Sequence, residues 1–150
     1  SSNSLEMTQL VLSYDPADLF GVHGQGHEIV REFESALESR GYTCLALGTS
    51  GNTDSTAQTR AAIRSCSVFV PLCSDQYGST QASLRVLEVA DAEDKRIIPV
   101  WLSGTYPPPA VTLLLSGLPR APRGARSAQQ AGLPAALDDL VGELVQAGCL

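Results

Sequence analysis

The sequence predicts an α/β fold, a doubly wound sheet of five parallel strands with helices on both faces. Short apolar runs alternate along the chain with stretches whose apolar residues recur at helical spacing. Two of these runs, Val68–Leu72 and Ile97–Leu102, are apolar throughout instead of alternating, which is typical of parallel strands covered on both sides. Right-handed crossovers then place successive helices on the two faces, in a flavodoxin-like arrangement.

The first strand and helix are separated by a glycine-containing loop. Gln9–Ser13 is predicted to be a buried strand that ends before Asp15-Pro16, because proline cannot continue a strand ladder. Beyond the loop, helical spacing is shown by Ile29, Val30, Phe33 and Leu37. Gly41 is predicted to end this helix.

The second strand is predicted over Tyr42–Leu47 and leads into the polar loop Gly48–Thr53. Asp54 or Ser55 is expected to cap the next helix, because a short side-chain oxygen bonds the free amides of the first turn. That helix stops near Ser65.

The second half continues the alternation. A helix carrying Glu88 joins the strands Val68–Leu72 and Ile97–Leu102, and we expect Pro71 and Pro99 to lie near strand ends. A short helix over Ala110–Leu115, a weak fifth strand near Leu118 and a last helix over Leu133–Val145 follow, with Pro134 in its first turn.

Composition limits the classes of function. A formal net charge of −6 argues against nucleic-acid binding, which depends on cations that neutralise phosphates. The basic run Arg120–Arg126 is interpreted as a solvated loop, with a phosphate or partner site as the alternative. No apolar run reaches the length of a membrane span, so we expect no membrane contact by this segment.

The four cysteines, at positions 44, 66, 73 and 149, lack the spacing of a zinc site. We expect reduced thiols, no metal site and a cytoplasmic location. Residues 1–7, which include the only methionine, Met7, are expected to be a cloning remnant, with residues 8–150 forming a single domain.

Four segments, taken in order, resemble the sequence boxes of Toll/interleukin receptor (TIR) domains. They are Leu10–Tyr14, Glu38–Tyr42, Ala61–Ser74 and Arg96–Val100. TIR domains commonly begin with a strand ending Ile-Ser-Tyr and carry an "iiPv" strand, and the resemblance covers roughly residues 9 to 102. It implies either signalling through self-association and TIR–TIR contacts or cleavage of the nicotinamide–ribose bond of NAD+, which would be a substrate with no cofactor required.

The resemblance also implies candidate site residues. Glu88 is the candidate catalytic carboxylate, although the enzymatic motif Ser-x-Trp-Cys-x-x-Glu is not reproduced here. The candidate NAD+ cleft comprises Tyr14, Asp15, Ser74 and Tyr77. The candidate partner-binding residues, in the loop after the second strand, are Gly48, Ser50, Gly51, Asn52 and Asp54.

Each candidate also has a purely structural interpretation. Glu88 is then a solvated helix residue, Tyr14 caps the core, Ser74 and Asp75 cap a turn, and Trp101 lies in the core. A TIR signalling module is therefore the leading hypothesis and an NAD+ glycohydrolase the alternative.

Other classes fit less well. Gly21–Gly26 lacks the spacing of a phosphate-binding loop, and His23 and His27 have no partner ligands nearby in the sequence. No GxSxG elbow indicates a hydrolase. A response-regulator receiver needs an aspartate after the third strand, where this chain has Cys73-Ser74.

Overall fold

The computed structural model describes residues 9–15, 26–48, 56–74 and 76–148. Residues 1–7, Ser50, Gly51, Asn52, Asp54 and His23 lie outside these ranges. The sheet has five parallel strands in the order β2-β1-β3-β4, with β5 also beside β3, and this confirms the predicted fold class. The strands are β1 (Leu10–Tyr14), β2 (Cys44–Gly48), β3 (Val68–Cys73), β4 (Arg96–Ile97) and β5 (Val100–Trp101).

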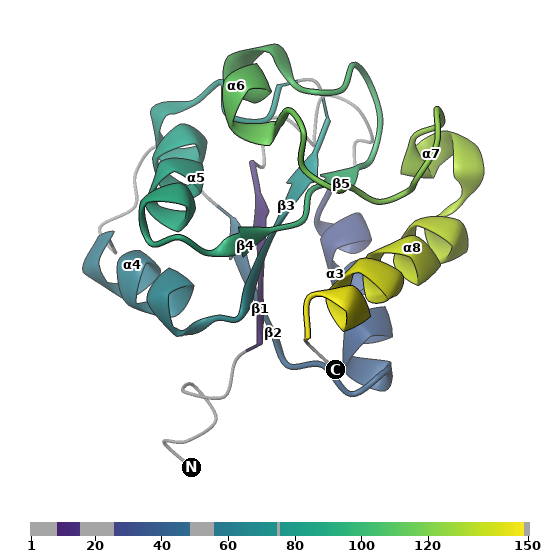
Figure 1. Ribbon diagram of the computed structural model, residues 1–150, viewed down its shortest axis with the longest axis horizontal. Helices are drawn as coiled ribbons and strands as arrows, with labels where there is room; N and C mark the ends of the chain where they lie inside the picture. The colour runs from purple at the N-terminus through teal and green to yellow at the C-terminus, as the bar shows by residue number, and fades with distance from the viewer. Residues whose placement is uncertain (1–8, 16–25, 49–55, 75, 149–150) are drawn as a thin grey trace.

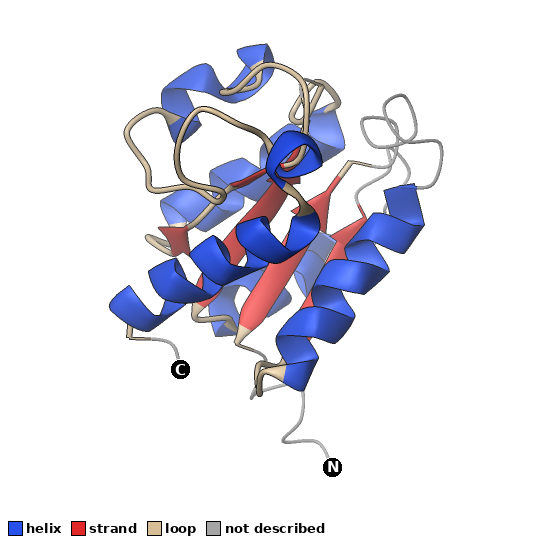
Figure 2. Cartoon of the chain, turned by 90° about the vertical axis from the view of Figure 1, so that its right-hand side faces the viewer, coloured by secondary structure: helices blue, strands red, loops and turns tan. Residues whose placement is uncertain are grey.

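Helices cover both faces of this sheet (Figure 1). One face carries α3 (Gly26–Ser39) and α8 (Leu133–Gln146), and the other carries α4 (Thr56–Ser65) and α5 (Gln81–Ala92). Figure 2 views the molecule from the α3–α8 side and shows these two helices in front of the strands. The layers are those of a doubly wound sheet.

The alternation of side chains along the strands creates two separate cores. Leu10 and Leu12 of β1 pack with α3 and α8, whereas Val11 packs on the α4–α5 side. In β3, Val70 and Phe69 divide in the same way. Successive side chains of a strand point to opposite faces, so each apolar run feeds both cores.

The predicted strand Ile97–Leu102 is broken into β4 and β5, and Pro71 explains where the break falls. Val68 donates its amide to Gln9 on the β1 side, and alternate residues of a central strand face alternate neighbours. The amide that Pro71 lacks therefore belongs to the β4–β5 side, opposite the gap that contains Pro99. Pro99 lies between β4 and β5, at a strand end as predicted, and Pro71 lies two residues before the end of β3, where the neighbouring ladder is interrupted.

The region after β5 differs from the prediction in two places. The weak strand expected near Leu118 is reduced to a single bridge in which Ala121 pairs with Val100. A short helix α7 (Ala128–Ala131) was not predicted, although Ser127 and Gln130 form a capping box. The expected helix over Ala110–Leu115 is present as a 3-10 turn, η1 (Pro109–Val111), followed by α6 (Thr112–Leu115).

Candidate functional site

The carboxyl ends of the parallel strands meet at one edge of the sheet, here called the carboxyl edge. Tyr14 of β1 is in register with Gly48 of β2, and β3 and β5 end beside them at Cys73 and Trp101. Asp15 and Ser74 follow the first and third strands directly. Ligands of open α/β sheets bind at this edge, so the sequence prediction placed the candidate cleft in the expected part of the fold.

Asp15 is the centre of a buried hydrogen-bond network. Its side chain is almost completely enclosed, at 1% exposure, and its Oδ2 accepts hydrogen bonds from Thr80 Oγ1 at 2.9 Å and Ser83 Oγ at 3.0 Å. Thr80 is also the N-cap of α5, because its hydroxyl accepts the Ser83 amide at 3.2 Å. A carboxylate at a helix N-terminus is favoured by the helix dipole. Asp15 therefore ties the end of β1 to the start of α5.

Tyr77 is also buried in the interior and hydrogen-bonded there. Its hydroxyl is 2.8 Å from Ser13 Oγ, and both residues are fully buried. The turn around it is closed by Gly78, whose φ of +85° suits glycine and whose Cα lies too close to Val111 for a side chain. Ser74 is also buried and its carbonyl accepts the Tyr77 amide at 3.2 Å. The ring of Tyr77 thus packs in the α4–α5 core.

Tyr14 lies on the other side of the sheet. It packs against the α3–α8 core, and its ring lies against Gly48, where a Cβ would be 2.5 Å from the Tyr14 hydroxyl. Burial, and then the negative charge of Glu34, raises the pKa of Tyr14 against the opposing effect of Arg31. Glycine at position 48 is therefore explained by its contact with Tyr14.

The candidate cleft residues consequently divide between two faces. Asp15 and Tyr77 belong to the α5 side, and Tyr14 belongs to the α3 side, as the period of two in a strand requires. The structure brings Asp15 and Tyr77 to the same side as Ser13, Thr80 and Ser83, which the sequence interpretation did not name. The hydroxyls of Thr80 and Ser83 bond with each other and with Asp15, whereas that of Ser13 bonds with Tyr77.

Glu88 lies apart from this network. It is exposed on α5, whose buried face consists of Ser83, Val86, Leu87 and Ala90. Glu88 is five positions after Ser83, which on an ideal helix places it about 7.5 Å further along the axis and about 140° around it. When Thr80, the residue that caps α5, is taken as the first position of the TIR enzymatic motif, the glutamate position falls on the buried Val86. The catalytic role of Glu88 remains a prediction.

A second cluster at the edge was not recognised from the sequence. The guanidinium carbon of Arg120 lies 5.0 Å from the ring centroid of Trp101 and 5.2 Å from that of Tyr106. Arg120 also donates to the carbonyls of Pro122 and Gly124, at 2.6 and 2.7 Å. Trp101 is only partly buried, and its ring packs against the guanidinium of Arg120. Because Arg120 is held by these contacts, this end of the basic run is not a free solvated loop.

The described residues provide no arrangement for a metal, since no three of their His, Cys, Asp and Glu side chains converge. Within the same residues no helix is both long and apolar enough to cross a membrane. Cys44, Cys66 and Cys73 are present as thiols.

A parallel sheet of this order, with an internally bonded carboxyl edge, defines a flavodoxin-like domain. A family model described as the TIR domain matches residues 22–133. The chain belongs to the TIR domain family, as the resemblance of its sequence boxes predicts.

Solved structures agree with this assignment. The crystal structure of the RPS4 and RRS1 TIR domain heterodimer matches with a TM-score of 0.60 and 13% identity, over 93% of this chain and 98% of that chain. The TIR domain of the Toll-related receptor TRR-2 from the lower metazoan Hydra magnipapillata matches with a TM-score of 0.61 and 10% identity, over 90% and 96%. A search of curated proteins finds no significant match. At these identities the structural matches establish the fold alone.

Proposed function

We propose that this chain is a cytoplasmic signalling module that acts by associating with itself or with other TIR domains. The observation that carries the proposal is the internal bonding of the carboxyl edge. Asp15 accepts from Thr80 and Ser83, and Ser13 pairs with Tyr77, so these groups fix β1 and the turn after β3 to α5. Groups used in this way form a rigid platform at the carboxyl edge.

Two further observations support association. One of the TIR structures with the same fold is a heterodimer of two TIR domains. In addition, Gly48, the first of the candidate partner residues, holds the end of β2 against Tyr14, and this contact fixes the point where the loop begins.

Cleavage of NAD+ gains no comparable support. Glu88 is exposed and separate from the Asp15 network, and the motif position discussed above is the apolar Val86. We therefore keep Glu88 as a testable alternative. Release of nicotinamide from NAD+ by concentrated protein, abolished by Glu88→Gln, would establish the enzyme.

The test of the proposed function is the molar mass in solution as a function of concentration. Sedimentation equilibrium should show mass rising above 15.8 kDa as protein concentration increases. The double variant Asn52→Ala/Asp54→Ala should weaken association by about 10-fold, equivalent to about 1.4 kcal/mol. Asp91→Ala, at an exposed position of α5, is the matched control. If the loop variant associates as well as the control, the loop has no part in the contact; a constant monomer mass at every concentration refutes the proposed function.

A further inference from the structure

A large apolar side chain on α6 is almost fully exposed. Leu113 of α6 is 95% exposed, while its neighbours Val111 and Leu115 are buried and anchor the segment on the α4–α5 core. No charged residue occurs between Arg96 and Arg120, although 17% of the chain is charged. Cores of protein interfaces are depleted of charge in the same way.

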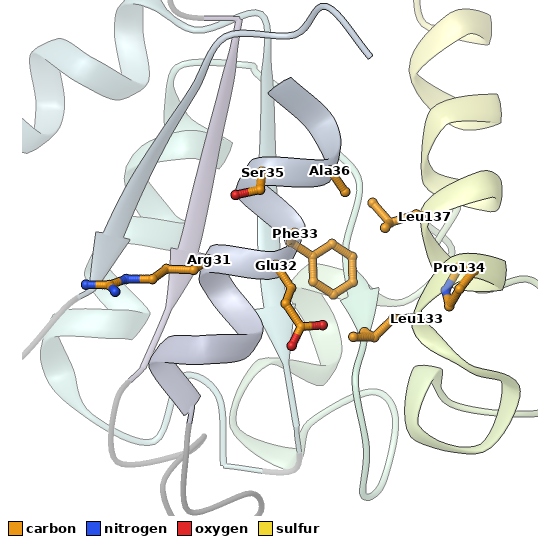
Figure 3. Close-up of a pocket in the computed structure, with 8 residues that line it drawn as sticks. All are labelled: Arg31, Glu32, Phe33, Ser35, Ala36, Leu133, Pro134 and Leu137. Carbon is orange, nitrogen blue, oxygen red and sulfur yellow. The ribbon is translucent and has the colours of Figure 1, made fainter. Parts of the chain in front are cut away.

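An apolar groove lies on the other face of the sheet, between α3 and α8 (Figure 3). Phe33 of α3 and Leu133 and Leu137 of α8 point toward one another across it, with Ala36 beside them. Its volume is about 780 Å³, and Leu133 also borders a smaller neighbouring pocket of about 220 Å³. The rim carries Arg31 and Glu32, a pair of opposite charge.

These two features cannot meet within one molecule. Leu113 belongs to the segment that packs on the α4–α5 core, whereas the groove opens on the α3–α8 side, and Figure 1 shows α6 well away from the gap between α3 and α8. A contact between them therefore requires a second chain.

We propose that Leu113 of one copy inserts into the α3–α8 groove of a second copy. This inference rests on the proposed function and names a second contact surface besides the loop after β2. Two copies that each carry a net charge of −6 repel one another over most of their surfaces. The charge-free segment around Leu113 brings no carboxylate toward Glu32 at the rim, so this approach avoids like-charge contacts.

The geometry of this contact is head to tail. Each copy offers one Leu113 and one groove, so a dimer retains one unused leucine and one unused groove. Such heterologous contacts continue into a ring or an open filament. Assembly beyond the dimer is therefore expected at high concentration.

Two variants separate the two halves of the contact. Leu113→Ser removes the inserted side chain, and Ala36→Arg fills the groove while keeping a good helix former on α3. Each variant alone should associate about 10- to 100-fold more weakly than the unchanged chain, the range expected for withholding one leucine side chain from burial. Val145→Ser, which removes a 56% exposed valine from α8 outside the groove lining, should associate normally.

The decisive experiment mixes Leu113→Ser and Ala36→Arg in equal amounts and measures mass by sedimentation velocity. The mixture should form a heterodimer of about twice 15.8 kDa and nothing larger, because only one intact leucine and one intact groove remain. Circular dichroism confirms folding of each variant, and Leu133→Gln replaces Ala36→Arg if that variant does not fold.

Other outcomes overturn the inference. Normal association of Leu113→Ser, or loss of association by the groove variant that mixing does not restore, indicates a symmetric or unrelated contact. Either result leaves the proposed function standing, because the unchanged chain still associates. A chain that never associates removes the proposed function and this inference together.

Discussion

Substitution of Asp15 provides a direct measure of how much the carboxyl edge contributes to stability. Asp15→Ala leaves the hydroxyls of Thr80 and Ser83 without the acceptor to which they donate at 2.9 and 3.0 Å. The two hydroxyls still lie 2.9 Å apart, and Ser83 Oγ still reaches the Thr80 carbonyl at 3.2 Å. We therefore expect the cost of about one lost partner, a loss of about 1–3 kcal/mol. Asp15→Asn retains the shape and one oxygen acceptor, so we expect it to lower the free energy of unfolding less than Asp15→Ala does.

The assay is urea unfolding at pH 7, followed by far-ultraviolet circular dichroism and by the fluorescence of Trp101, the only tryptophan. Asp138→Ala is the control, since Asp138 pairs with Arg40 at 2.9 Å with side chains that are 69% and 40% exposed. That surface pair should contribute less than about 1 kcal/mol.

A double-mutant cycle identifies the cause. Adding Ser83→Ala to Asp15→Ala should cost less than Ser83→Ala costs alone, because residues of one hydrogen-bond network are coupled by about 0.5–3 kcal/mol. If Asp15→Ala lowers stability no more than Asp138→Ala, Asp15 is not a structural tie, and the reasoning that assigns the edge to a platform fails.

Three further predictions concern other contacts. Tyr106→Phe removes a buried hydroxyl that has no hydrogen-bond partner among the described residues, so stability at neutral pH should stay the same or rise by up to about 1 kcal/mol. Burial, and then the nearby Cys73, raises the pKa of Tyr106. As pH rises, the Tyr106 phenol therefore ionises first in the unfolded chain, near pH 10, and the free energy of unfolding falls above that value. Tyr106→Phe should make this fall shallower. An unchanged alkaline unfolding curve would contradict this expectation. Lys95→Met removes an ammonium that donates to the carbonyls of Arg64 and Cys66, at 2.7 and 2.9 Å, at the end of α4. This variant should lower the free energy of unfolding in urea by about 1–2 kcal/mol. Arg85→Met, at an exposed position, is the control and should be neutral. Gly48→Ala should lower the free energy of unfolding by about 1–3 kcal/mol, because the added methyl group overlaps Tyr14. Gly142→Ala in α8 has room for the methyl group and should be stabilising. Equal thermal midpoints for the two variants would refute the Tyr14 contact.

The fold was accessible from the sequence because apolar runs and helical spacing are local signals. The break between β4 and β5 was not, since it depends on Pro71 facing Pro99 across two strands that are distant in the chain. The helix α7 could have been found, because Ser127 and Gln130 have the spacing of a capping box.

The candidate site was harder to predict for a different reason. The sequence identified Tyr14 and Asp15 as residues at the end of the first strand, but adjacent strand residues point to opposite faces, so their side chains have different neighbours. The partners of Asp15 come from Thr80 and Ser83, which reach it only when α5 packs beside β1. The exposure of Glu88 follows from the apolar stripe at Val86, Leu87 and Ala90, which was readable in advance.

Whether this TIR domain acts by association is decided by the molar mass of the unchanged chain in solution. Sedimentation equilibrium from about 1 μM to about 1 mM covers the affinities expected of weak signalling contacts. If the domain acts by association, the mass rises steadily from 15.8 kDa toward that of dimers and larger species. A mass that remains at 15.8 kDa throughout this range would contradict it.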